Sequence, residues 1–242
     1  MSLEEFHRNF RSDLQTIIAE RVEAGEGPFP SDELVFAEMV MEHVAETGIC
    51  EAPTVCHWSG KVGNARLRIT GYALSSDETA LDLFVTHYFG TEELSDLRDP
   101  DATATASEGV RFLFRAASGN LDARIDPTHP VRDLVATIRS RWGDIDRLRV
   151  FVITDGKTKT KRFSNKEAHQ KMVAVEAMDM ERLFRHTEGK PRDELAVSFV
   201  QSIGRALPCV HVPDPDADYE YALTAIPGQL IRDLYLRYGT TL

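Results

Sequence analysis

One stretch, RLRVFVITDG at residues 147–156, limits the folds open to this chain more than any other part of the sequence. Its apolar residues run almost without interruption instead of alternating with polar ones. Such a run is typical of a β-strand that is buried on both faces, in the middle of a sheet covered by helices. The sequence therefore indicates a sheet with at least one fully covered strand.

The segments before this run have clear periodicities. A capping-box pattern at Ser2 and Glu5 opens an amphipathic helix that ends near residues 23–30, and Ser31 opens a second helix that Gly48 ends. Extended segments follow, separated by short polar turns, at residues 53–60, 65–74 and 80–89. They predict a three-stranded antiparallel meander. Two more helices are expected, at residues 107–118 and 130–142.

After the buried run we expect a Lys-rich turn, a strand at residues 172–178 and a helix at residues 180–186. The order of elements predicts a mixed α/β domain over residues 1–204. Beyond Gly204 the sequence turns rich in prolines and acids, and it then predicts a short apolar helix at residues 229–238. Because an apolar helix face needs a partner, we interpret residues 205–242 as the start of a C-terminal region that is truncated here.

Composition and charge narrow the function. The net charge of −11 argues against a protein that coats nucleic acid generally, since phosphate binding needs clustered Lys and Arg. No apolar segment approaches the roughly 20 residues of a membrane span, and the first residues do not form a signal peptide, so we expect a cytoplasmic protein without membrane contact. Three cysteines do not form a disulfide framework. A zinc site built from His43, Cys50, Cys56 and His57 would match no familiar spacing.

Two stretches resemble the abortive infection phage resistance (AIPR) proteins of bacteria: RITGYALSSDETALDLFVTHYF at residues 68–89 and DYEYALTAIPGQLIRDLYLRYGTTL at residues 218–242. The resemblance implies an N-terminal domain of an antiviral defence protein. It also implies a restriction-endonuclease-like core, which is a mixed sheet in the order helix, three-strand meander, helix and strand, flanked by helices. The periodicities alone give the same order.

A nuclease of this fold needs an acid on one strand and an acid two positions before a Lys on the next, so that carboxylates hold Mg²⁺ and the Lys steadies the attacking water. The resemblance puts Thr70 where the first acid is expected. In the next strand Asp82 is followed two residues on by Phe84, so the acid-x-Lys pair is missing. Glu38 and Glu42 would supply the helix acid. We take Glu38, Glu42 and Asp82 as the candidate catalytic residues of a metal-dependent nuclease. Mg²⁺ is expected only if hydrolysis survives, and no other cofactor is indicated.

A structural role is the favoured alternative for Thr70, Asp82 and His87. Period-2 alternation separates the strand into two faces: Leu81, Leu83, Val85 and His87 on one, and Asp82, Phe84, Thr86 and Tyr88 on the other. In this interpretation His87 is a core histidine and Asp82 is a solvated strand residue.

Residues 155–171 gather positive charge in an otherwise acidic chain. The candidate nucleic-acid-binding residues are Lys157, Lys159, Lys161, Arg162, Lys166 and Lys171. The alternative is a turn kept in solution by its charges. Asp155 and Gly156 form an ordinary turn pair, although an acid after a buried strand also lies where α/β proteins place functional groups.

Two functions stay open. The first is a nuclease-like module, acting on or binding nucleic acid in a phage-defence protein, with a degraded metal site. The second is a non-enzymatic sensing or assembly module that packs against a partner, against the missing C-terminal region or against a second copy in a homo-oligomer. The missing acid-x-Lys pair favours the second function, and the basic stretch supports the first.

Overall fold

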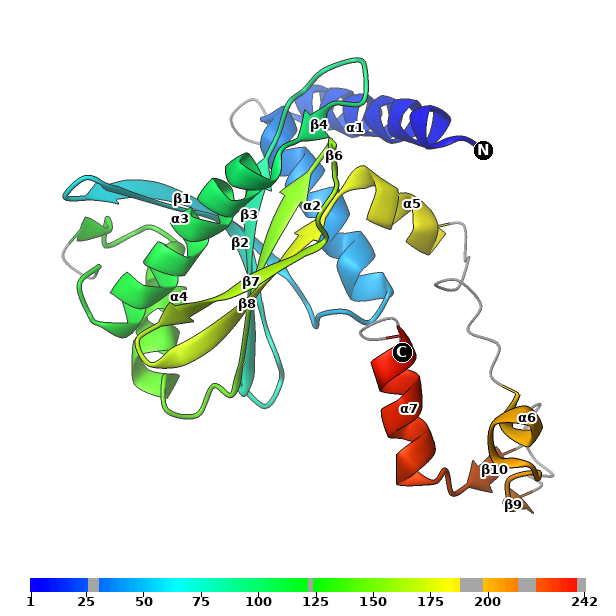
Figure 1. Cartoon of the computed structure of the whole chain (residues 1–242). Helices are drawn as coiled ribbons and strands as arrows, with labels where there is room; N and C mark the ends of the chain where they lie inside the picture. Colours follow the sequence, from blue (N-terminus) through cyan, green and yellow to red (C-terminus); the bar gives the residue numbers. More distant parts are fainter. Residues whose placement is uncertain (26–30, 122–123, 188–197, 213–220, 239–242) are drawn as a thin grey trace. The chain divides into compact units, whose positions relative to one another are not determined.

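The computed structural model describes residues 1–25, 31–121, 124–187, 198–212 and 221–238 (Figure 1). The chain divides into two compact units, Met1–Glu188 and Gly189–Leu242. Helix α6 (Phe199–Ile203) belongs to the second unit, whereas the change in composition after Gly204 suggested a later domain boundary. That boundary stays a prediction, because compactness alone does not define a domain.

The first unit is built around a six-stranded mixed sheet with the order β1-β2-β3-β5-β8-β7. Its strands are β1 (Thr54–Val62), β2 (Ala65–Leu74), β3 (Ala80–His87), β5 (Arg147–Thr154), β7 (Arg162–Ala168) and β8 (Lys171–Met178). The first three strands are antiparallel neighbours, which confirms the expected meander. Strand β5 runs parallel to both β3 and β8, and β7 closes the other edge antiparallel to β8. The apolar run at 147–156 therefore forms an inner strand, as its composition predicted.

Helices cover both faces of this sheet, which explains why β5 is apolar on both sides (Figure 1). One face packs against α1 (Leu3–Ala24), α2 (Asp32–Glu46) and α5 (Met180–Thr187), and the other against α3 (Asp99–Ala117) and α4 (Val131–Arg141). In β3, Leu83 and Val85 join the α3 and α4 side, while Phe84 joins the α1 and α2 side. The expected alternation of faces is confirmed.

The first two helices begin and end where the sequence predicts. At α1 the Glu5 N–H donates to the Ser2 hydroxyl, and the Ser2 N–H donates back to the Glu5 carboxylate at 2.8 Å. Gly25, with φ +68°, ends the helix. Helix α2 follows Ser31, although the Ser31 hydroxyl makes no capping hydrogen bond. Gly48, with φ +70°, follows its last turn.

Two expectations need correction. Helix α3 begins at Asp99 rather than at residue 107, because Pro100 suits a first helical turn while the following Ala and Thr residues carry no apolar periodicity. The expected Lys-rich turn at residues 155–171 contains two strands: β6 (Lys157–Thr158), which pairs in parallel with β4 (Asp96–Leu97), and the whole of β7. The side chains of an edge strand can stay exposed, so they can be charged without being buried in a core. The sequence of such a strand therefore lacks the usual apolar alternation.

Helix α3 approaches the sheet closely at Gly109. A Cβ atom added at this position would lie 2.6 Å from Cγ2 of Val85 and 3.2 Å from Cγ1 of Val150. Only a residue without a side chain fits between the helix and strands β3 and β5.

The second unit contains an antiparallel pair, β9 (Cys209–Val212) and β10 (Tyr221–Thr224), and helix α7 (Gly228–Tyr238). The helix expected at residues 229–238 is confirmed. Leu230 is buried and Ile231 is exposed. Among the described helices, none combines the length and apolar character that crossing a membrane requires.

Candidate functional site

Asp82 is buried in an ion pair with Arg149. The two residues are partners in the parallel ladder between β3 and β5. Arg149 donates from Nε to Oδ1 of Asp82 at 2.7 Å and from Nη2 to Oδ2 at 2.6 Å, and Asp82 is only 2% exposed. Its expected solvation is therefore wrong, because a cross-strand guanidinium compensates its burial. Both carboxylate oxygens already accept hydrogen bonds.

A hollow of about 170 Å³ borders Asp82 and is lined by Cys50, Glu51 and Arg147 among others. Burial, followed by the charge of Asp82, raises the pKa of the Cys50 thiol to about 11. The thiol is therefore protonated at neutral pH and is a poor nucleophile or metal ligand.

Thr70 has a structural role between β2 and β3. It is 0% exposed, and its hydroxyl accepts hydrogen bonds from the backbone N–H of Thr86 at 3.1 Å and from the Thr86 hydroxyl at 3.0 Å. The antiparallel pairing of the two strands runs from Leu74 to Gly71, so the Thr70 hydrogen bonds extend the connection by one residue. Thr86 lies four residues along β3 from Asp82, about 13 Å away at the usual rise of a strand.

The two helix acids do not join Asp82. Glu38 forms an ion pair across to α1, with Oε2 2.7 Å from Nη1 of Arg21, and Glu42 is exposed on α2. Among the residues that the structure describes, no group of three His, Cys, Asp or Glu side chains is arranged to hold a metal ion. The residues present therefore do not fit a hydrolytic Mg²⁺ site.

His87 ends β3 and lies against α3. Its Nδ1 is 3.1 Å from the hydroxyl of Thr105, and burial, together with the nearby charge of Arg68, lowers its pKa. A neutral, hydrogen-bonded, half-buried imidazole fits the interpretation as a core histidine.

Three of the six candidate cations are engaged within the protein. Lys157 lies 3.6 Å from Asp96. Lys161 is paired with the buried carboxylate of Asp179 and, at 2.8 Å, with Glu181. Lys171 donates to the carbonyl oxygen of Gly143 at 3.1 Å. These three side chains are held by contacts with β4, with the start of α5 and with the segment after α4.

The other three cations, Lys159, Arg162 and Lys166, form no ion pair with any acid in the described parts of the chain. Arg162 and Lys166 belong to the edge strand β7, and Lys159 lies just before it. The structure thus brings these three cations to one edge of the sheet. Charges on an edge strand also prevent pairing with other chains, which is the structural alternative.

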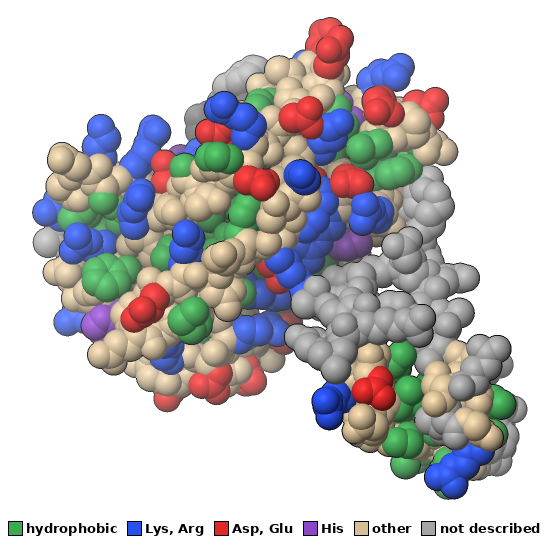
Figure 2. All heavy atoms as spheres, viewed as in Figure 1, with side chains coloured by type: hydrophobic (Ala, Val, Ile, Leu, Met, Phe, Trp, Pro, Cys, Tyr) green, Lys and Arg blue, Asp and Glu red, His purple; other side chains and the backbone are tan. Residues whose placement is uncertain are grey.

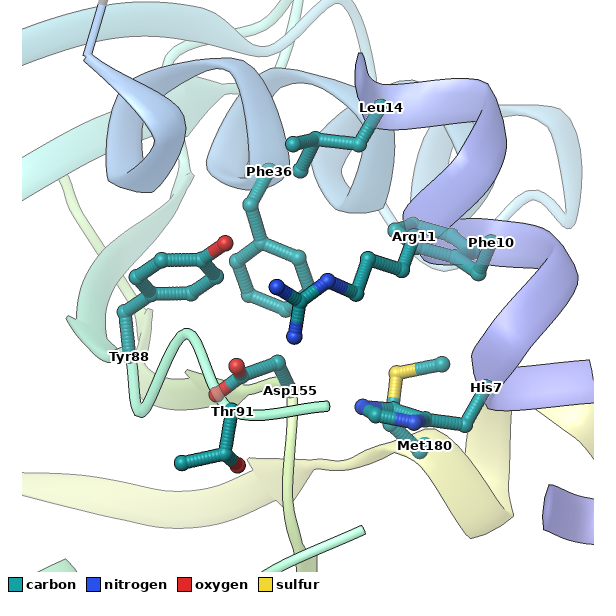
Figure 3. Close-up of a pocket in the computed structure, with 9 residues that line it drawn as sticks. All are labelled: His7, Phe10, Arg11, Leu14, Phe36, Tyr88, Thr91, Asp155 and Met180. Carbon is teal, nitrogen blue, oxygen red and sulfur yellow. The ribbon is translucent and has the colours of Figure 1, made fainter. Parts of the chain in front are cut away.

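Asp155 lies where the parallel strands β3 and β5 end. Its carboxylate accepts the backbone N–H groups of Phe89 and Gly90, each at 2.8 Å, while Arg11 donates to the Gly90 carbonyl oxygen at 3.3 Å. Figure 3 shows Arg11 and His7 reaching from α1 toward this carboxylate, with Tyr88 beside it. The pocket between these side chains measures about 10 Å³, which is about the least that one water molecule needs.

This arrangement clamps the loop that follows β3. A Cβ atom added at Gly156 would lie 2.7 Å from the Phe89 ring and from the Ser95 carbonyl oxygen, so the Asp-Gly pair is fitted to the loop. Burial, with the charge of Asp155 second, raises the pKa of Tyr88 to about 12. Burial also lowers the pKa of His7, which Asp155 opposes. The sequence signal for this clamp was an Asp-Gly turn directly after a buried strand.

Comparison with known proteins gives one result. The sequence model of one protein family, the abortive infection phage resistance protein N-terminal domain, matches residues 36–185. Comparisons with curated proteins and with solved structures gave no match. The matched residues cover more than half of the chain and include all six strands of the sheet. This chain therefore belongs to the abortive infection phage resistance family, through the N-terminal domain of that family.

Proposed function

We propose that this chain is the N-terminal domain of a phage-defence protein and that it binds nucleic acid without hydrolysing it. Membership of the family supports the defence role. The order helix, three-strand meander, helices and strand supports a restriction-endonuclease-like core. One observation carries the absence of hydrolysis: Arg149 occupies both oxygens of Asp82, the single acid in the strand that should supply the acid-x-Lys pair.

The binding surface in this proposal is the β7 edge. Lys159, Arg162 and Lys166 are free to contact phosphates, and all three lie within the family match. Phosphate contacts by Lys and Arg supply sequence-independent affinity. In a chain of net charge −11, such a local patch would limit binding to one part of the surface.

The test of binding compares two variants that each lose three positive charges. Lys159→Ala/Arg162→Ala/Lys166→Ala removes the free cations of the edge, and Arg8→Ala/Lys61→Ala/Arg124→Ala removes exposed cations elsewhere. Fluorescence anisotropy with labelled single-stranded DNA, single-stranded RNA and duplex DNA measures affinity at low salt. We expect the edge variant to bind at least about tenfold more weakly than the control variant. Equal affinities of the two variants would show that the β7 edge is not the binding surface.

The test of hydrolysis incubates the wild-type protein and Asp82→Asn with plasmid, single-stranded DNA and RNA in Mg²⁺ or Mn²⁺. We expect intact nucleic acid in every reaction. Cleavage by the wild type that is lost in a folded Asp82→Asn protein would contradict the proposal. Failure of the wild type to bind any of these nucleic acids would favour the sensing or assembly module instead.

A further inference from the structure

Three aromatic rings form a row on the side of the sheet that α3 and α4 cover. The ring of His169, in the turn between β7 and β8, lies 6.0 Å from the ring of Phe114 and 6.2 Å from that of Trp142, measured between centroids. Phe114 is 39% exposed on α3, and His169 is also exposed. An apolar ring that reaches water beside two other rings differs from a single exposed hydrophobic residue, which is ordinary.

Positive charge surrounds this row. The Arg115 guanidinium lies 5.7 Å from the Phe114 ring, and the Lys171 ammonium 5.5 Å from the Trp142 ring. Lys166 is the ladder partner of Val173, which is buried on the α3 side, so the Lys166 side chain points to the same side. Arg115 and Lys166 form no ion pair with an acid among the described residues, whereas Arg111 donates from Nη1 to the Arg66 carbonyl oxygen at 3.4 Å. Figure 2 shows hydrophobic, histidine and basic side chains close together at the lower left, with an acidic side chain among them.

The turn that carries His169 is held in an unfavourable backbone conformation. Ala168 pairs with Lys171, so His169 and Gln170 form a two-residue hairpin turn, with φ of +44° and +69°. A turn with positive φ at both positions favours Asn-Gly. His adopts a positive φ more readily than most residues, whereas Gln170 is strained there. The Trp142 indole N–H donates to the His169 carbonyl oxygen at 3.3 Å and so fixes the turn beside the rings. Strain of this kind is concentrated at functional sites.

We propose that Phe114, His169 and Trp142 form a stacking site for the unpaired bases of a single-stranded nucleic acid. The phosphates of that strand contact Arg115 and Lys166. Aromatic faces accept any base, while neighbouring cations track the backbone, and a duplex hides the base faces that the rings require. This inference names the substrate class for the proposed nucleic-acid binding and rests on that function.

The experiment separates base contacts from phosphate contacts. The probes are oligothymidylate and oligouridylate of about twelve nucleotides, an abasic oligonucleotide of the same length and a duplex. The ring variant is Phe114→Leu/His169→Asn, which keeps an apolar side chain at 114 and a turn-forming residue at 169. We expect it to bind both single strands at least about fivefold more weakly than the wild type and to bind the abasic strand unchanged. A difference between the thymidylate and uridylate losses distinguishes DNA from RNA as the strand preferred.

The outcomes distinguish this inference from the proposed function. If the wild type binds the thymidylate and abasic strands equally, or if the ring variant binds thymidylate as the wild type does, the stacking site is wrong. The proposed function still stands in that case when the edge variant Lys159→Ala/Arg162→Ala/Lys166→Ala binds more weakly. If the edge variant also binds normally, both proposals fail.

Two further measurements do not use the ring variant Phe114→Leu/His169→Asn. His169→Asn/Gln170→Gly relieves the turn, so we expect a higher melting temperature together with weaker binding of the single strands. A higher melting temperature with unchanged binding of the single strands would contradict the stacking site. Trp58→Phe leaves Trp142 as the one tryptophan of the two in the chain. Its fluorescence should be quenched by oligothymidylate but not by the abasic strand, and equal quenching would contradict stacking.

Discussion

Asp82 and Arg149 share two hydrogen bonds in a part of the sheet that water scarcely reaches. Arg149 also donates to the Ile49 carbonyl oxygen at 2.7 Å, so one guanidinium joins β3, β5 and the segment after α2. Such a buried pair adds little net stability compared with an apolar pair of the same shape. Removal of one of the two residues is costly, because the other charge then stays buried without a partner.

Asp82→Ala should lower the free energy of unfolding by about 3–5 kcal/mol, because Arg149 would be left buried and unpaired. Asp82→Leu/Arg149→Met should lose much less, since it removes both charges. Urea denaturation of the two variants and the wild type measures the difference. Unchanged stability of Asp82→Ala would mean that the carboxylate does not neutralise Arg149, and it would restore Asp82 as a candidate ligand.

One buried histidine, His7, and two half-buried ones, His43 and His87, make stability depend on pH. Burial lowers the pKa of His7, His43 and His87 below the ordinary value of 6.5. A histidine with a lowered pKa in the fold takes up its proton more readily when unfolded, so its contribution is complete above pH 6.5 and is lost as the pH falls below it. We expect the melting temperature to fall between about pH 7.5 and pH 5.5. His87→Asn should flatten this profile, and a profile as steep as that of the wild type would exclude His87 from it.

Gly109 allows helix α3 to pack close to the sheet. In an exposed helix, Gly→Ala is stabilising by about 1 kcal/mol. At Gly109 the added Cβ would lie 2.6 Å from Val85, so we expect Gly109→Ala to lower the free energy of unfolding by about 1–3 kcal/mol through overpacking. Gly143→Ala is the matched control, because its Cβ would meet no atom within 4 Å. Chemical denaturation distinguishes them, and stabilisation by Gly109→Ala would show that the helix can move away.

The helices and strands that could be predicted are those whose sequences have a local apolar periodicity. Helix α1, the meander and the buried strand β5 carry apolar patterns that packing does not override. Strand β7 was missed because a charged edge strand has no such pattern. The pairing of Asp82 with Arg149 and of Lys161 with Asp179 was also beyond reach, because strands and helices distant in sequence supply the partners. Candidate residues could be named from the sequence, but their neighbours decide which of them are free.

For the whole molecule, the contrast between the net charge of −11 and the local basic surface predicts how salt acts. If single-stranded nucleic acid binds at the β7 edge, affinity should fall steeply with salt, by about 0.7 logarithmic units per decade for each phosphate neutralised. Lys159→Ala/Arg162→Ala/Lys166→Ala should reduce that slope by up to about 2. Anisotropy titrations at several salt concentrations measure it. The same slope in this variant and in Arg8→Ala/Lys61→Ala/Arg124→Ala would place the phosphate contacts elsewhere.

The parallel pairing of β3 with β5 also has a consequence for biosynthesis. The meander of β1, β2 and β3 is complete by His87, but its neighbour β5 begins only at Arg147, after α3 and α4. Parallel neighbours across such a crossover require a large loop to close, which slows folding. While a ribosome makes the intervening helices, β3 therefore has an unpaired edge, and its apolar residues Leu83 and Val85 lack their final cover. We expect the nascent chain to be most prone to aggregation during this interval, until β5 pairs with β3.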